Sequence, residues 1–294
     1  MQNLRNRASP ARLIKLYRYI SEDQREMIAN VKFDGLLKIA CTTMPVDFAN
    51  WLMSECFDPE SSELVLPGRG RILVTPKAVA NILNLPDKGD EVKYELDVDA
   101  INFIYSKYGI IQGQAPRIEE IMERIKQNKR ADEDFLRSWM MIAVSTFLCP
   151  PTGLGISPRC YPALLDLTRV NKLNWCQFVV DQLKEAARKM NKQNSVRGCI
   201  LLLVVSPHPF FMHCHFTICI LSFFLPSTSC CKFFTFLHLT PFFQILYVDS
   251  LDVGNVQIPT TKPRIAAWSR KLLDQVIKLD TNRDGSFGKL KVMG

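Results

Sequence analysis

The stretch Asp132-Glu-Asp-Phe-Leu-Arg-Ser-Trp-Met-Met-Ile-Ala-Val-Ser-Thr-Phe147 decides the fold class of this chain. Its apolar residues, from Phe135 through Trp139 to Ala143, recur at helical spacing, and Asp132 stands where an N-terminal cap belongs. The pattern is apolar all round by Phe147, which is typical of a helix enclosed by a core. We therefore predict a central helix that begins at Asp132 and is packed on every side.

Helical patterns flank this stretch on both sides. In 116–127, Ile118, Ile121, Met122 and Ile125 have the i, i+3, i+4, i+7 spacing of one helix face. Further helices are predicted at 12–27, 45–56, 97–108 and 174–190, and after Lys262-Pro263. The four tryptophans are expected to anchor the core: Trp51, Trp139, Trp175 and Trp268.

The segment 63–74 has a different pattern. Two short apolar runs flank Pro67-Gly-Arg-Gly-Arg71, which predicts a β-hairpin. The turn lacks the G-x-x-x-x-G-K-[ST] pattern of a phosphate-binding loop. Thr75-Pro76 then has the residue types that open a helix, and Leu85-Pro86 closes it. The predicted fold is mainly α, a compact multi-helix domain with one small β-hairpin at about 63–74.

Composition limits the class of protein. The chain has 294 residues, 37 Lys+Arg and 29 Asp+Glu, a net charge of +8, and 47% hydrophobic residues. This balance excludes a disordered chain, a collagen-like repeat and a disulfide-rich mini-protein. Scattered single cysteines without a secretory signal predict reduced thiols in an intracellular, unsecreted protein. The first 21 residues carry five basic residues and no acid, a composition found in transit peptides and in ordinary basic arms. We interpret 1–30 as a basic N-terminal helical arm and 31–294 as one helical domain.

The segment 205–244 interrupts this domain with a sharp change of composition. It holds all four histidines, ten of the 18 phenylalanines, four of the ten cysteines and no acid. One interpretation is a membrane anchor at 200–225, but the cleanly apolar part, 216–225, is too short to span a bilayer. Another is a metal site, but the spacing is not that of structural zinc sites. Its ligands would come from His213, Cys214, His215, Cys219, Cys230 and Cys231.

A translated retained intron is the interpretation that we favour for 205–244. Pyrimidine-rich codons specify Phe, Leu, Ser, Pro, Cys and His, which dominate here. Val205-Ser206 is compatible with a splice-donor sequence and Gln244 with a splice acceptor. Excision keeps the frame and joins 199–204 directly to 245–248, giving one continuous apolar element whose length favours a helix.

No complete catalytic constellation is present. Outside 205–244 there is no histidine, so the remaining chain has no imidazole for Cys-His, Ser-His or His-metal chemistry. Asp280-Thr-Asn-Arg-Asp-Gly285 matches the first half of an EF-hand calcium loop, but position twelve is Lys291 where a bidentate glutamate is needed. We predict a helix-terminating turn there, no enzyme activity, no metal, no cofactor and no small-molecule substrate.

The excess positive charge suggests a polyanionic partner. Lys126-Gln-Asn-Lys-Arg130 has the composition of a nuclear-import patch and also that of a solvated helix end. If nucleic acid binds, phosphate contacts would make the affinity fall steeply with salt. The predicted contacts are Lys129, Arg130, Lys262, Arg264, Arg270 and Lys271.

Several blocks of the sequence together resemble a known family. Its most specific part is the hairpin followed by a V-x-x-I-L-x-L-P-x-x-G block at 79–89. Other matching blocks are Phe33-Asp-Gly-Leu-Leu-Lys-Ile39, Trp51-Leu52, Asp134-Phe-Leu-Arg-Ser-Trp139 and Leu246-Tyr-Val-Asp-Ser-Leu-Asp252. This order resembles the plant mobile domain, also called the aminotransferase-like plant mobile domain, of grass transposon-derived proteins, over about 31–278 without 205–244.

The resemblance implies a non-enzymatic, transposon-derived protein that acts in the nucleus as a protein- or nucleic-acid-associated module. The aminotransferase-like label implies no activity, and no lysine-centred cofactor motif is present. Some family members precede a SUMO-protease domain, so the alternative is the truncated leader of such a cysteine peptidase. A membrane-anchored protein and a pseudogene fragment are further alternatives.

Overall fold

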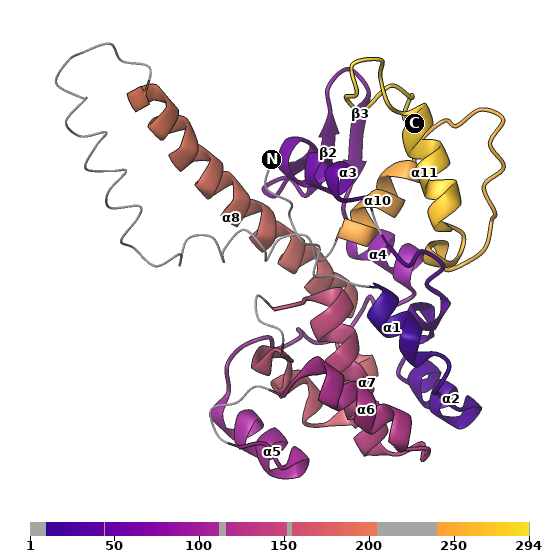
Figure 1. The fold of residues 1–294 in the computed structure, drawn as a ribbon, viewed down its shortest axis with the longest axis vertical. Helices are drawn as coiled ribbons and strands as arrows, with labels where there is room; N and C mark the ends of the chain where they lie inside the picture. Colours follow the sequence, from indigo (N-terminus) through magenta and orange to yellow (C-terminus); the bar gives the residue numbers. More distant parts are fainter. Residues whose placement is uncertain (1–9, 44, 112–115, 152–154, 205–239, 294) are drawn as a thin grey trace.

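The computed structural model describes residues 10–43, 45–111, 116–151, 155–204 and 240–293. Helices dominate, and the one sheet has three antiparallel strands in the order β1-β2-β3, which confirms the predicted mainly α class with a small β element (Figure 1). The α-helices are α1 (Pro10–Leu16), α2 (Glu22–Asn30), α3 (Val46–Trp51), α4 (Pro76–Leu83), α5 (Val98–Tyr108), α6 (Ile118–Gln127), α7 (Glu133–Ala143), α8 (Trp175–Val204), α10 (Thr240–Val248) and α11 (Arg270–Leu279).

The hairpin forms where the sequence predicts it. Strands β2 (Glu63–Leu66) and β3 (Gly70–Leu73) pair with Glu63 opposite Leu73. A short strand not predicted from the sequence, β1 (Phe57–Asp58), adds to the free edge of β2.

The predicted single helix over 12–27 is two helices. Ser21 begins α2 with a capping box: its hydroxyl accepts from the Gln24 amide at 3.3 Å, and the Gln24 side chain accepts from the Ser21 amide at 3.0 Å. This reciprocal pair satisfies the first free amides of α2 and fixes the chain direction there. The apolar residues Leu13, Leu16 and Ile28 are fully buried, so α1 and α2 belong to the same core as the rest of the chain.

The core centres on α7, as the sequence predicts. Every residue of α7 from Phe135 to Ala143 is buried. Phe33 packs edge-on against Trp139 at 6.2 Å and against Trp175 at 5.3 Å between ring centroids. Trp268 is also fully buried, whereas Trp51 is half-buried and stacks on Phe48 at the core margin. Short 3₁₀ or π turns complete the path at 34–38, 52–56, 144–148, 158–160, 162–164, 167–172 and 264–266.

The element predicted by joining 199–204 to 245–248 belongs to two helices in this chain. The first segment ends α8 and the second ends α10. Phe242, Phe243 and Gln244, from the end of the predicted insertion, are buried in the first part of α10. The Gln244 side-chain amide donates to the Pro45 carbonyl at 2.6 Å, and its Oε1 has no partner among the described residues.

Candidate nucleic-acid interface

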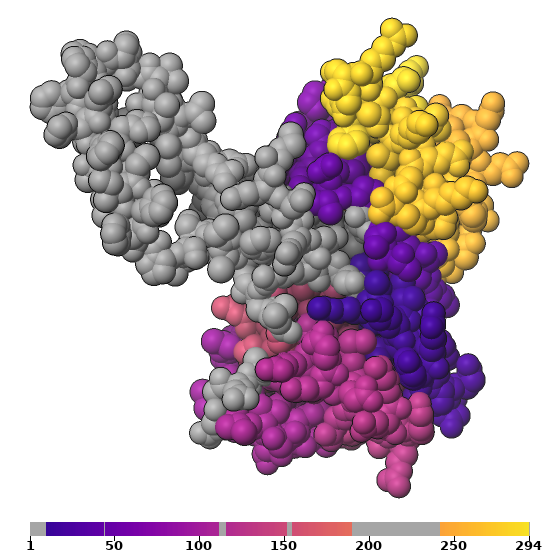
Figure 2. Space-filling view, viewed as in Figure 1, coloured from indigo at the N-terminus to yellow at the C-terminus, as the bar shows by residue number. Residues whose placement is uncertain are grey.

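Lys129 and Arg130 lie in the loop that follows α6, and a buried glutamine holds this loop in place. Gln24, on α2, donates from Nε2 to the carbonyls of Asn128 at 2.8 Å and Arg130 at 3.0 Å. Because Gln24 is fully buried, the loop backbone has a fixed position against α2 while both basic side chains stay exposed. Figure 2 shows the N-terminal segment beside the α6 region on one face of the molecule.

An exposed aromatic ring lies against the same loop. Tyr19, between α1 and α2, is 42% exposed. The ammonium of Lys126 lies 5.4 Å, and that of Lys129 5.9 Å, from its ring centroid. Lys129 also donates to the Tyr19 carbonyl at 3.2 Å. The arrangement gathers two lysines around one accessible ring, a combination that suits both phosphate attraction and base stacking.

The basic side chains of this loop differ in whether a carboxylate neutralises their charge. Lys126 pairs with Glu123 at 3.1 Å. In the part of the chain that the structure covers, no carboxylate pairs with Lys129 or Arg130. We name Tyr19, Lys126, Lys129 and Arg130 the Tyr19 patch.

Two of the predicted C-terminal contact residues, Arg264 and Arg270, form ion pairs with carboxylates of the same chain. Arg264 donates from Nε to Asp249 at 2.9 Å, and this hydrogen bond raises the pKa of the Arg264 guanidinium. Arg264 also donates to the Pro259 carbonyl at 2.6 Å. Arg270 pairs with Asp274 at 2.7 Å. Both arginines therefore have partners within the fold.

Lys262 and Lys271 remain exposed, but at a separate place. They lie before and in the first turn of α11, whereas Lys129 and Arg130 directly follow α6, which lies apart from α11 in the lower part of the view (Figure 1). The six predicted contacts therefore form two groups rather than one continuous surface. The sequence missed Tyr19, whose lysine neighbours lie more than a hundred positions away along the chain.

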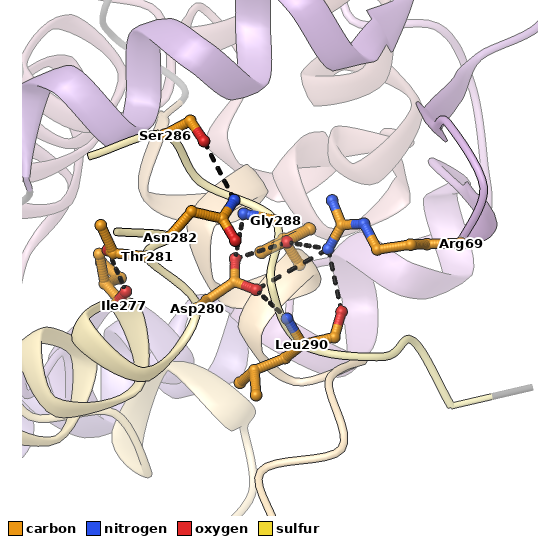
Figure 3. Close-up of polar contacts among 9 residues, drawn as sticks. Arg69, Ile277, Asp280, Thr281, Asn282, Ser286, Gly288 and Leu290 are labelled. Carbon is orange, nitrogen blue, oxygen red and sulfur yellow. Dashed lines mark hydrogen bonds and ion pairs between the residues drawn. The ribbon is translucent and has the colours of Figure 1, made fainter. Parts of the chain in front are cut away.

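The two near-motifs of the sequence meet in one buried cluster (Figure 3). Asp280, the first residue of the EF-hand-like loop, has no exposed surface. Its carboxylate accepts from the Tyr247 hydroxyl at 2.7 Å and from the backbone amides of Leu290 at 2.7 Å and Gly288 at 3.2 Å. Arg69, from the glycine-rich hairpin turn, lies 3.8 Å from the same carboxylate.

In this cluster, residues of the hairpin turn and of the EF-hand-like loop hold each other in place. Arg69 donates to the Tyr247 hydroxyl at 2.8 Å and to the Leu290 carbonyl at 3.1 Å. A Cβ at Gly288 would lie 2.6 Å from the Arg69 guanidinium, so the glycine allows this close approach. The Asp280 carboxylate faces the hairpin, and α11 ends at Leu279 directly before it, as predicted for a helix-terminating turn. Of the described residues, no group of three or more His, Cys, Asp or Glu is placed to hold a metal.

Four cysteines of the core have thiols that are poor nucleophiles. Burial raises the pKa of the Cys56, Cys160 and Cys176 thiols to about 12, and that of Cys149 to about 11. These thiols are therefore protonated at neutral pH, and a thiolate is the reactive species. All four histidines, and the cysteines 214–231 considered with them as an alternative metal site, lie outside the described residues.

Comparison with known proteins gives one relationship. Residues 6–204 match the family model named Domain of unknown function (DUF8566). The chain belongs to this family. The matched region includes the Tyr19 patch and ends at residue 204, directly before the predicted insertion.

Two other findings bear on the sequence predictions. No curated protein and no solved structure matches the chain. None of the described helices has the length and apolarity needed to cross a membrane. Residues 205–225, which belong to the alternative interpretation of a membrane anchor at 200–225, are not among those described.

Proposed function

We propose that this chain is a non-enzymatic, transposon-derived plant mobile domain protein that associates with nucleic acid in the nucleus through the Tyr19 patch. The observation that carries the nucleic-acid part is the position of Lys126 and Lys129 around the exposed Tyr19 ring. The resemblance to the plant mobile domain supports the nuclear and transposon-derived parts. The chain's charge of +8 supports a polyanionic partner.

The Tyr19 patch is favoured over the C-terminal group for two physical reasons. Arg264 and Arg270 have carboxylate partners. In the patch only Lys126 is paired, and Lys129 and Arg130 have no carboxylate partner among the described residues. The patch also supplies a ring that can stack on a base, a contact that remains effective when salt screens the lysines.

Fluorescence anisotropy with a labelled single-stranded oligonucleotide tests the proposal. The chain is expected to bind with an affinity that falls as salt rises, because each phosphate contact releases a counterion. The plot of log affinity against log salt has a negative slope. The variant Lys129→Ala/Arg130→Ala is expected to make this slope less steep by about 1.4, or about 0.7 for each lost contact on a single strand.

A matched variant controls for charge alone. Lys262→Ala/Lys271→Ala removes the same two charges from the other exposed group and is expected to leave the slope nearly unchanged. Equal losses in both variants would show that only net charge matters, and wild-type protein without salt-dependent binding would refute the nucleic-acid function.

A further inference from the structure

A groove separate from the Tyr19 patch runs along the first half of α8. One wall is the extended segment 89–94, and the other is a single face of α8. That face carries Gln177, Phe178, Asp181 and Gln182, and Asn174, directly before α8, continues the same i, i+3, i+4, i+7 and i+8 spacing. The cavity between the walls has a volume of about 400 Å³, which is in the range of ligand pockets.

The first wall is fastened at both ends. Asp90 donates its backbone amide to the Lys172 carbonyl at 2.9 Å and accepts from the Asn174 amide at 2.7 Å. Gly89 lies so close that an added Cβ would be 1.8 Å from the Lys172 carbonyl oxygen. At the other end, the Tyr94 hydroxyl lies 3.0 Å from Ser157 Oγ. The groove is therefore formed before any ligand arrives.

The groove carries negative charge on a basic protein. Glu91 stands on one wall and Asp181 on the other, and both are exposed. Among the described residues, no lysine, arginine or histidine lines the cavity. Within the described part of the chain, neither carboxylate has an ion-pair partner, although Asp181 accepts a hydrogen bond from Gln177 at 2.9 Å. The segment 90–99 holds five acidic residues and one lysine, while the whole chain has a charge of +8.

The apolar lining of the groove is aromatic. Tyr94 and Phe178 pack with ring centroids 5.3 Å apart, and Val92 lies beside them. A long side chain with an apolar stem and a cationic head matches this lining, because its stem can cover the rings while its head reaches the two carboxylates. A guanidinium has five donors in a plane and suits carboxylate and ring together better than an ammonium does.

We propose that this groove is a docking site for a basic segment of a partner protein and that it receives an arginine side chain between Glu91 and Asp181. The partner's positive charge complements the local acidic segment and is repelled by the basic remainder of the chain, which restricts docking to the groove. The site is independent of nucleic-acid binding by the Tyr19 patch.

Binding of a labelled glycine- and serine-rich peptide that carries arginines tests the proposal on the full chain. The same peptide with citrulline in place of arginine keeps the shape and removes the charge, and it is expected to bind at least about tenfold more weakly. The variant Glu91→Gln/Asp181→Asn is expected to weaken the arginine peptide about five- to twentyfold, since each partly exposed ion pair contributes a few-fold.

The control variant Glu95→Gln/Asp99→Asn removes two charges from the same acidic segment outside the cavity. It is expected to change peptide affinity less than about twofold, and far-ultraviolet circular dichroism of both variants checks that they are folded. Equal binding of the citrulline peptide, or an equal loss in the control variant, overturns the proposal. Because the assay contains no nucleic acid, its outcome is separate from that of the proposed function.

Discussion

Replacing Arg69 tests whether the buried Asp280 cluster fixes the C-terminal segment to the hairpin. Asp280 has no exposed surface, and the Arg69 guanidinium is the cation nearest its carboxylate, at 3.8 Å. Arg69→Met keeps most of the side-chain volume but removes the charge and the hydrogen bonds to Tyr247 and the Leu290 carbonyl. The carboxylate is then left buried without a counter-charge.

The expected magnitude follows from the contacts that remain. Breaking a buried ion pair typically costs about 3–5 kcal/mol. Asp280 keeps its hydrogen bonds from Tyr247, Gly288 and Leu290, so we expect the lower end, about 3 kcal/mol. With about 2.1 cal/mol/K of unfolding entropy per residue, a chain of 294 residues would lose roughly 5 °C in Tm.

Thermal unfolding followed by circular dichroism measures this loss, and two further variants control it. Arg71→Met changes a nearby arginine in β3, whose side chain is exposed and pairs with Glu63, and is expected to cost less than about 1 kcal/mol. Arg69→Met/Asp280→Asn removes both charges and is expected to be more stable than Arg69→Met alone. A Tm loss no greater than that of Arg71→Met, or a double variant as unstable as the two single changes added, would refute the reasoning.

Three other expectations concern different parts of the chain. In anisotropy, Tyr19→Ala is expected to weaken single-stranded oligonucleotide binding about five- to hundredfold, since one stacked base contributes about 1–3 kcal/mol. Tyr19→Trp is expected to retain binding, and equal effects of both changes would argue against stacking. In the folded chain the pKa of the Cys56, Cys160 and Cys176 thiols is raised to about 12, whereas unfolded thiols ionise near pH ~8.5. The free energy of unfolding is therefore constant with respect to these thiols below pH ~8.5. Above it, unfolding releases their protons, and the free energy of unfolding falls by roughly 1.4 kcal/mol per thiol for each pH unit. Urea unfolding at neutral and alkaline pH measures this loss, and an unchanged midpoint contradicts it. Deleting 205–244 is expected to leave a chain that unfolds in one cooperative transition, and mature transcripts are expected to lack these codons. A chain with this deletion that shows no such transition would count against the retained intron.

The Gln244 environment gives a physical reason for the last expectation. Gln244 is fully buried in a mostly apolar helix, and its Oε1 has no partner among the described residues. A buried acceptor without a hydrogen bond is unfavourable. Joining Val204 to Ile245 would place a valine at this position and leucines at the two before it. The end of the family match at residue 204 agrees with the same boundary.

The local pattern of the sequence determined most of the secondary structure. Thr75, Asp97 and Asp132 all cap helices, and each accepts a hydrogen bond from an amide three residues ahead. Such contacts depend only on neighbours along the chain, so residue type and spacing suffice to predict them. The same is true of the hairpin, whose two strands are joined by a turn of a few residues. The break at Ser21 was missed although its capping box is also local, because apolar residues continue at helical spacing on both sides.

Only the tertiary structure decided which charged and polar groups meet. Sequence patterns treated Lys129 and Arg264 alike as exposed cations, yet Arg264 is held by Asp249 while Lys129 lies beside Tyr19. Arg69 and Asp280 belong to separate near-motifs, and the fold brings them together across more than two hundred residues. The physical reason is that the apolar period fixes which face of a helix is buried, whereas the partner of a charged side chain depends on how distant elements pack.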